Sequence, residues 1–120
     1  MTSILSRATA PAAVLGASAP PTPGMLHLGI GTFHRAHAAV YTAKAMAAQG
    51  GDWGIVAVAN RSRRVVDALA GQDYLYSILE LSSAGERVDV MDVHRETLVA
   101  AEQTAELMAR IAHPDIKVVT

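Results

Sequence analysis

The chain has 120 residues, of which 51% are hydrophobic and 18% are charged, a balance typical of a packed globular domain rather than a disordered segment. Its formal net charge of −1 gives no general attraction for nucleic acid or an anionic membrane, and the absence of cysteine excludes disulfides and thiolate chemistry. A chain without cysteine suits a reducing compartment, so we expect a cytoplasmic protein. From the net charge we expect no binding to nucleic acid or membranes.

Residues 1–24 are rich in alanine and proline. Pro11, Gly16 and Ser18 interrupt their apolar patch, which is therefore a poor match to a secretory signal. The prolines that follow favour an extended backbone. We predict a flexible leader over residues 1–24 and a folded region over residues 25–120.

The first half of the folded region has the pattern of a βαβ unit. Residues 25–30 form an apolar run typical of a strand buried on both faces. Helical periodicity follows until Gly50 and Gly51, and a second buried strand is predicted over residues 55–59. Such a unit is typical of a parallel sheet with a right-handed crossover.

The second half breaks this rhythm. We predict a short helix over residues 63–70 with Ser62 as its N-cap, a β-hairpin of residues 74–81 and 87–93, a helix over residues 101–112 and a last strand over residues 116–120. The predicted fold class is α/β, a partial doubly wound, Rossmann-like parallel sheet with an inserted β-hairpin. Because that fold pairs a fourth strand with the first, we expect the first strand to be an open edge and the chain to be the front piece of a longer protein.

Two glycines separate the first strand from the first helix. Gly29 permits a tight turn, and Gly31 lets the backbone approach a pyrophosphate that faces the N–H groups of the helix start. His34 stands where the usual fingerprint has a third small residue. The alternative is a tight turn that binds no ligand.

The polar residues after the glycines allow several interpretations. Arg35 either contacts an anion or, like His37, hydrogen-bonds within the turn. His34 and His37 have a spacing that places both rings on one side of a helix, but no third ligand is near in sequence, and we predict no metal site.

The end of the second strand reads Asn60, Arg61, Ser62, Arg63, Arg64 and contains no acid. NAD-binding folds commonly place an acid there, and NADP-binding folds place an arginine nearby. The segment is therefore either a site for a phosphorylated adenosine or a solvated basic helix start. No serine nucleophile elbow, HExxH motif or P-loop supports a hydrolase or a P-loop enzyme.

The motifs together resemble those of the mannitol dehydrogenase family, the long-chain polyol and hexuronate dehydrogenases that include fructuronate and tagaturonate reductases. GIGTFHRAH at residues 29–37 is the most specific stretch, followed in the same order by GDWG at residues 51–54 and DAL at residues 67–69. The resemblance covers residues 25–120. The Arg-Ser pair at residues 61–62 is more similar to the fructuronate reductases.

The resemblance implies an N-terminal NAD-binding portion, with NADP as the alternative cofactor. It also implies hydride transfer between the cofactor and a polyol or hexuronate, of the mannitol/fructose or mannonate/fructuronate type. The family's catalytic lysine, asparagine and histidine lie in a C-terminal domain without counterpart here. We therefore assign no catalytic residue and expect this chain alone to be inactive. The implied cofactor-binding residues are Gly29, Ile30, Gly31, Thr32, Phe33, His34, Asn60 and Arg61.

Two other functions remain open from the sequence. One is a truncated, non-catalytic nucleotide-binding remnant. The other is an interaction module that uses an exposed strand edge.

Overall fold

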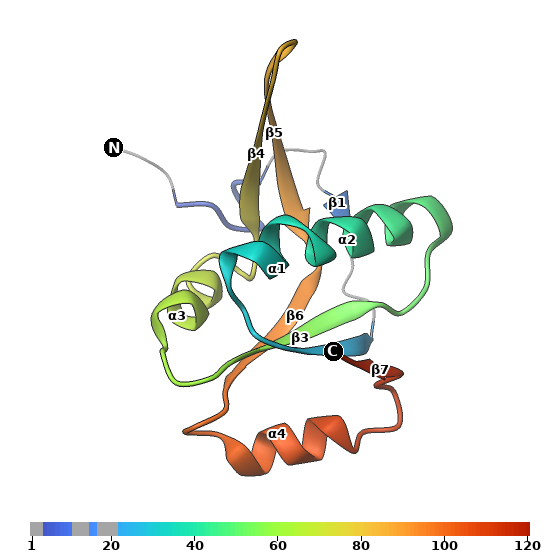
Figure 1. Cartoon of the computed structure of the whole chain (residues 1–120), viewed down its shortest axis with the longest axis vertical. Helices are drawn as coiled ribbons and strands as arrows, with labels where there is room; N and C mark the ends of the chain where they lie inside the picture. The colour runs from blue at the N-terminus through green and yellow to red at the C-terminus, as the bar shows by residue number, and fades with distance from the viewer. Residues whose placement is uncertain (1–3, 11–14, 17–21) are drawn as a thin grey trace.

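A computed structural model describes residues 4–10, 15–16 and 22–120 of the chain. Its centre is a four-stranded parallel sheet in the order β6-β3-β2-β7. These strands are β2 (Pro23–Leu28), β3 (Gly54–Ala59), β6 (His94–Val99) and β7 (Val118–Val119). Figure 1 shows helices α1 to α3 on one side of this sheet and α4 on the other. The predicted α/β class with a parallel sheet and a separate hairpin is confirmed.

The helices have the following bounds: α1 is Thr32–Ala36, α2 is Ala38–Gln49, α3 is Arg64–Ala70 and α4 is Thr104–Ile111. The predicted first helix is thus two helices, because the backbone of His37 leaves the helical region. Gly50 ends α2 as predicted. Arg63, rather than Ser62, occupies the N-cap of α3, although the Ser62 hydroxyl accepts a hydrogen bond from the backbone N–H of Arg64. None of the described helices is long and apolar enough to cross a membrane.

The central strand β3 explains how the sheet holds its two helical layers together. All of its residues are buried. Ile55 and Ala57 face the core under α2, to which α2 contributes alanines and a methionine, whereas Val56 and Val58 face the core under α4. Small side chains on α2 let the helix approach the sheet closely, so the strand ends beside it are held in fixed positions.

The prediction that the first strand is an open edge is wrong. β7 pairs with β2 in parallel, with Met25 opposite Val118 and Leu26 opposite Val119. The chain's last residue extends this pairing, because the Leu28 N–H donates to the Thr120 carbonyl at 2.8 Å. The order β6-β3-β2-β7 is that of strands 3-2-1-4 in a doubly wound fold, so the fourth strand is already present. β7, with two exposed valines, is the edge instead.

The sequence interpretation also missed β6. It ended the hairpin at residue 93 and placed no strand before the next helix. In the structure, β6 follows the hairpin directly and pairs with β3 along its whole length. The pattern His-Arg-Glu-Thr-Leu-Val lacks the apolar continuity of the other buried strands, which is why it gave no strand signal.

The predicted hairpin is confirmed as β4 (Tyr76–Ser82) and β5 (Gly85–Asp92), an antiparallel pair. It projects away from the body of the molecule (Figure 1). Its base is anchored in the main core by Tyr76 and Met91, whereas its outer part is exposed. A short strand β1 (Leu15–Gly16) pairs in parallel with the base of β5.

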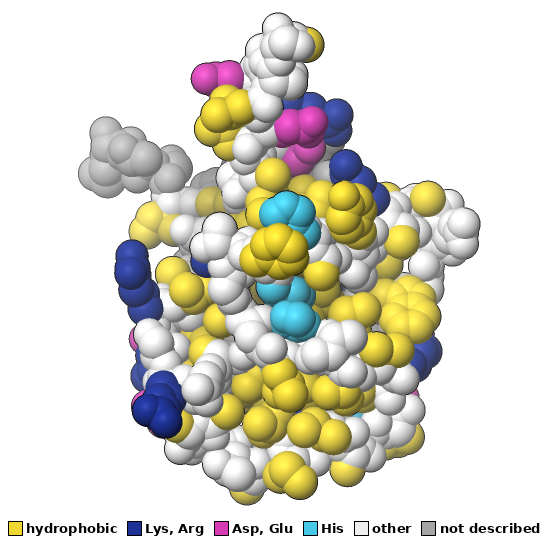
Figure 2. Space-filling model, in the orientation of Figure 1, with side chains coloured by type: hydrophobic (Ala, Val, Ile, Leu, Met, Phe, Trp, Pro, Cys, Tyr) yellow, Lys and Arg dark blue, Asp and Glu magenta, His cyan; other side chains and the backbone are white. Residues whose placement is uncertain are grey.

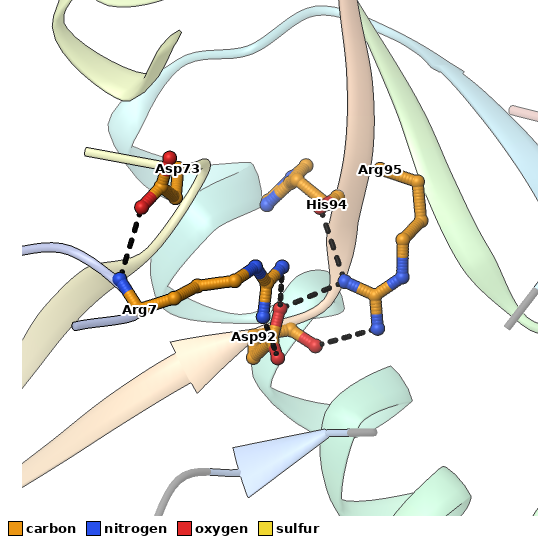
Figure 3. A network of polar contacts seen from close by, with 5 residues as sticks. All are labelled: Arg7, Asp73, Asp92, His94 and Arg95. Atoms are coloured by element: carbon orange, nitrogen blue, oxygen red, sulfur yellow. Dashed lines mark hydrogen bonds and ion pairs between the residues drawn. The ribbon is translucent and has the colours of Figure 1, made fainter. Parts of the chain in front are cut away.

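Part of the predicted leader, residues 1–3, 11–14 and 17–21, lies outside the described residues. Within the described part, the Arg7 guanidinium binds both carboxylate oxygens of Asp92, at 2.8 and 2.9 Å. The Arg7 N–H also donates to Asp73 (Figure 3). Flexibility of residues 1–24 as a whole stays a prediction.

Candidate functional site

The carboxyl end of β2 leaves a row of backbone N–H groups without partners. Leu28 and Gly29 still donate to the neighbouring strands, Gly29 to the Val58 carbonyl at 2.8 Å. The next five N–H groups, those of residues 30–34, donate no hydrogen bond to any other described residue. Consecutive free N–H groups at the carboxyl end of a central parallel strand form a site for an anion.

The two glycines of this turn have different roles. Gly29 has a φ of 124°, a conformation that residues with a side chain rarely adopt, so it is needed to make the turn. Gly31 has a φ of −65° that any residue can adopt, and a Cβ placed there would meet nothing within 4 Å. The protein alone therefore gives no reason for glycine at position 31, whereas a ligand lying against the backbone would.

Side chains of Arg35 and Tyr76 hold the turn in place through hydrogen bonds to its backbone. The Arg35 Nε donates to the Ile30 carbonyl at 3.0 Å, and its Nη2 lies 3.4 Å from the Thr32 hydroxyl. The Tyr76 hydroxyl, at the base of the hairpin, donates to the Arg35 carbonyl at 2.7 Å. Of the two interpretations of Arg35, hydrogen bonding within the turn is what the structure shows. Arg35 also lines an open recess.

The side chain of His34 points into the protein, away from the open side of the turn. It is 5% exposed, its Nε2 lies 3.0 Å from the Nε2 of His94, and its ring stacks on that of His27 at 4.0 Å between centroids. The position that usually holds a small residue is therefore filled by an imidazole that reaches β6. Sequence reasoning missed His27 and His94. The pairing of β6 with β3 brings His94 close, and His27 lies on β2 just before the turn.

Burial sets the protonation state of these rings. It lowers the pKa of His34 to about 4, with further contributions from the charges of His27 and Arg35. It lowers the pKa of His94 to about 3, with further contributions from His34 and Arg95. Both imidazoles are therefore neutral at pH 7, and one donates its Nε2–H to the other.

The outer side of the turn carries Phe33, which is 78% exposed and stacks on the ring of His37 at 4.4 Å. Figure 2 shows histidine side chains grouped in the middle of this face, with hydrophobic side chains beside them. The Nδ1 of His37 lies 3.0 Å from the Phe33 carbonyl, which agrees with a role of His37 within the turn. Among the described residues, no group of three or more His, Cys, Asp or Glu side chains is arranged to hold a metal ion.

The end of β3 lies beside this turn. Asn60 follows the strand and borders an apolar recess of about 440 Å³ on the α4 side of the sheet. The recess is lined by Leu28, Gly29, Val58, Asn60, Ala100 and Leu107. Gly29, at the edge of this recess, directly precedes the row of free N–H groups. One ligand could therefore contact the N–H groups and fill the recess. Arg61 is exposed next to it and does not line it.

A second network fixes the strand that carries His94. Asp92, 1% exposed, binds Arg7 on one side and the Nη1 of Arg95 at 2.8 Å on the other (Figure 3). Arg95 also donates to the Asp92 carbonyl at 2.9 Å. The N-terminal residues are thus joined to the junction of β5 and β6, two residues from His94.

Replacing Arg7 by alanine should lower the free energy of unfolding by about 1–2 kcal/mol, because the buried carboxylate of Asp92 loses a bidentate partner and, among the described residues, keeps Arg95. Thermal or urea unfolding measures this. Arg87→Ala is the matched control, since Arg87 pairs with Asp89 on the exposed hairpin and should cost less than 0.5 kcal/mol, as surface pairs do. Equal losses in the two variants would contradict the anchoring role of Arg7.

Comparison with known proteins adds a family. A model described as the mannitol dehydrogenase Rossmann domain matches residues 23–120. The chain is similar to a mannitol 2-dehydrogenase of Pyricularia oryzae, with 40% identity over 102 residues, and to one of Cereibacter sphaeroides, with 37% over 102 residues. These matches cover 81% and 82% of this chain but 20% and 21% of the relatives, so the chain spans about a fifth of their length.

Two solved structures share the fold. One is the mannitol 2-dehydrogenase of Pseudomonas fluorescens in a ternary complex with NAD and D-mannitol, with a TM-score of 0.78 and 39% identity, covering 84% of this chain and 21% of that one. The other is a D-sorbitol dehydrogenase in substrate-free form, with a TM-score of 0.84 and 30% identity, covering 98% of this chain and 26% of that one.

Proposed function

This chain belongs to the mannitol dehydrogenase family of oxidoreductases through its Rossmann domain, and from that premise we propose that residues 25–120 bind NAD as the N-terminal portion of a hydride-transferring enzyme. The observation that carries the proposal is the row of five free backbone N–H groups over residues 30–34, beside an apolar recess. The NAD in the Pseudomonas fluorescens complex supports the choice of cofactor.

The residues fit such a cofactor on their own chemistry. The N–H groups of Ile30 to His34 would donate to the pyrophosphate, and Gly31 leaves the space in which it can approach the backbone. The recess of about 440 Å³ offers apolar side chains to an adenine ring, with the Asn60 amide at its rim for a ribose hydroxyl. When bound, NAD supplies the nicotinamide carbon that accepts or donates the hydride.

In this proposal the predicted site residues contribute in unequal ways. Gly29 shapes the turn, and Ile30, Thr32 and His34 act through their backbone N–H groups, because the side chains of Ile30 and His34 are buried. Phe33 presents an exposed ring to the ligand side. Arg61 remains at the adenosine end as an exposed cation.

For the whole protein we propose a polyol or a hexuronate as substrate. The mannitol 2-dehydrogenases among the relatives support mannitol and fructose, and the Arg-Ser pair at residues 61–62 supports mannonate and fructuronate. We expect the 120-residue chain to give no sustained turnover of NADH with fructose or fructuronate, because the resemblance places the catalytic lysine in a later domain. Sustained turnover by this chain would contradict the placement of the catalytic residues in a later domain.

The other untested expectations stay predictions. A boundary near residue 24 between a leader and the folded region is testable by limited proteolysis, and a cytoplasmic location, suggested by the absence of cysteine, by cell fractionation. The lack of binding to nucleic acid, suggested by the net charge of −1, is testable by filter binding.

Calorimetric titration with NAD+ and NADH tests cofactor binding. We expect saturable binding of both, with one cofactor per chain, and competition by 5′-AMP for the adenosine half. A folded chain that binds neither NAD nor NADP in any oxidation state would overturn the proposal.

The competing function is a strand-edge interaction module, favoured by the apolar side chains exposed near β7. Leu28, Val118 and Val119 are 53%, 38% and 44% exposed. Such a module would associate with increasing concentration and ignore NAD. Sedimentation across a concentration series, with and without NAD+, separates the two functions.

A further inference from the structure

The three arginines after β3 differ in how they are paired. Arg63 is neutralised, since its guanidinium contacts the carboxylates of Glu102 and Asp67. The side chains of Arg61 and Arg64 form no ion pair and no hydrogen bond with another described residue, and both residues are exposed. Two uncompensated positive charges therefore stand at the strand end where the adenosine half of a dinucleotide would lie.

Arg64, one of these two arginines, lines a recess. A space of about 560 Å³ lies between the glycine turn and α3, on the side of the sheet opposite the apolar recess. Gly31, Thr32 and Arg35 line it from the turn, and Arg64 and Val65 line it from α3. Two arginines, Arg35 and Arg64, thus line one recess, together with the glycine that would contact the pyrophosphate.

No Asp or Glu lines this recess, and residues 60–64 include none. The nearest acid along α3, Asp67, is engaged by Arg63. A carboxylate at the end of this strand is the group that selects NAD, because it accepts hydrogen bonds from the ribose hydroxyls and repels a 2′-phosphate. That repulsion is missing here.

Resting on the proposed function, we propose that Arg64, with Arg35 across the recess and Arg61 at its edge, binds a phosphate monoester on the adenosine ribose. The site therefore takes NADP at least as tightly as NAD. A phosphate dianion beside a guanidinium forms charge-assisted, bidentate hydrogen bonds. Arg35 keeps its bonds to the turn while it adds positive charge, and Arg64 is free to move toward the ligand.

The test compares NADP+ with NAD+ by calorimetry at fixed ionic strength on the 120-residue chain. We expect NADP+ to bind at least as tightly as NAD+. We expect Arg64→Ala to weaken NADP+ about tenfold while NAD+ changes less than about twofold, since only NADP carries the 2′-phosphate. Arg64→Glu should reverse the preference. The Arg64 side chain forms no ion pair or hydrogen bond with another described residue, so neither change removes such an interaction.

Arg63→Ala is the matched control. It removes an identical side chain one position away, but one that is already neutralised, so the ratio of the two affinities should stay within about twofold of the unchanged chain. A second readout is the ³¹P signal of the 2′-phosphate, whose pKa should fall on binding and fall less in Arg64→Ala.

The outcomes separate this inference from the function on which it rests. Binding of NADP+ more weakly than NAD+, or equal weakening of both cofactors by Arg64→Ala, would overturn the inference and leave the proposed function standing. Failure of both cofactors to bind the folded chain would overturn both.

Discussion

The Gly31→Ala substitution is expected to weaken NAD binding by about tenfold or more, or about 1.4 kcal/mol, without a measurable loss of stability. The reason is that the space beside Gly31 is empty of protein, and the backbone there has a conformation that alanine adopts without strain. A methyl group at this point would stand between the pyrophosphate and the free N–H groups of the turn.

Gly71→Ala is the matched control. Gly71 ends α3 with a φ of −67°, and a Cβ there would lie 3.4 Å from the nearest atom, so alanine is tolerated. Both variants should unfold at the same temperature as the unchanged chain within about 2 °C, and only Gly31→Ala should lose affinity in calorimetry. Unchanged NAD affinity in Gly31→Ala would show that the ligand does not approach this backbone.

Acid is expected to destabilise the fold well above the pH at which carboxylates titrate. His34 and His94 have pKa values of about 4 and about 3 in the fold, against about 6.5 in an unfolded chain. Well above pH 6.5 both states are neutral and the shift has no effect. Below it, the unfolded chain binds protons that the folded chain does not, so the free energy of unfolding falls as pH falls.

The expected loss in the free energy of unfolding is large for a chain of this length. Between pH 7 and pH 5 each ring costs about 2 kcal/mol, so the pair costs about 4 kcal/mol of stability. The hydrogen bond between the two Nε2 atoms adds a structural reason, because one of them must be unprotonated to accept it. The charges that oppose protonation from neighbouring elements are those of His27, Arg35 and Arg95.

Two measurements check this expectation. Urea unfolding at pH 7, 6 and 5 should give a falling free energy of unfolding, and the slope should be unchanged in the control His113→Gln, whose ring is exposed. NMR titration of the histidine ring protons should find His34 and His94 still neutral at pH 5. If His34 and His94 titrate near pH 6.5, the buried pair does not exist in solution.

The parts of the fold that could be predicted are those that depend on residues close together in the sequence. The strand before Gly29, the alanine face of α2 and the turn between β4 and β5 each follow from short-range preferences. The structure confirms these elements, although β2 ends at Leu28, which is exposed, rather than at residue 30. The family resemblance rested on the same local motifs, and the comparisons confirm it.

The parts that were missed depend on contacts between distant residues. β6 has a mixed polar and apolar sequence because Arg95 and Glu96 bind Asp92 and Arg110, and these partners cannot be read from the strand itself. The pairing of β7 with β2 and the contact of His34 with His94 join residues 60 or more positions apart. Sequence spacing carries no information on such pairs until the sheet order is known.

The site could be predicted only in outline. Gly29 and Gly31 were recognisable from their spacing, but their separate roles follow from backbone angles and empty space. His34 was predicted to bind the cofactor, and the structure turns its side chain inward, which leaves its backbone N–H as the group that can serve. The difference in pairing between Arg63 and Arg64 required the position of Glu102.

The location of the cofactor is tested most directly by ¹H–¹⁵N NMR spectra of the chain titrated with NAD+. The amide signals of Ile30 to His34 and of Asn60 should shift together and saturate, because these groups would surround the pyrophosphate and the adenosine ribose. Signals of Met25 and Ile55, at the opposite end of the same strands, should stay in place. Shifts confined to the hairpin or to the edge strand β7, with the signals of residues 30–34 unmoved, would contradict the proposed site.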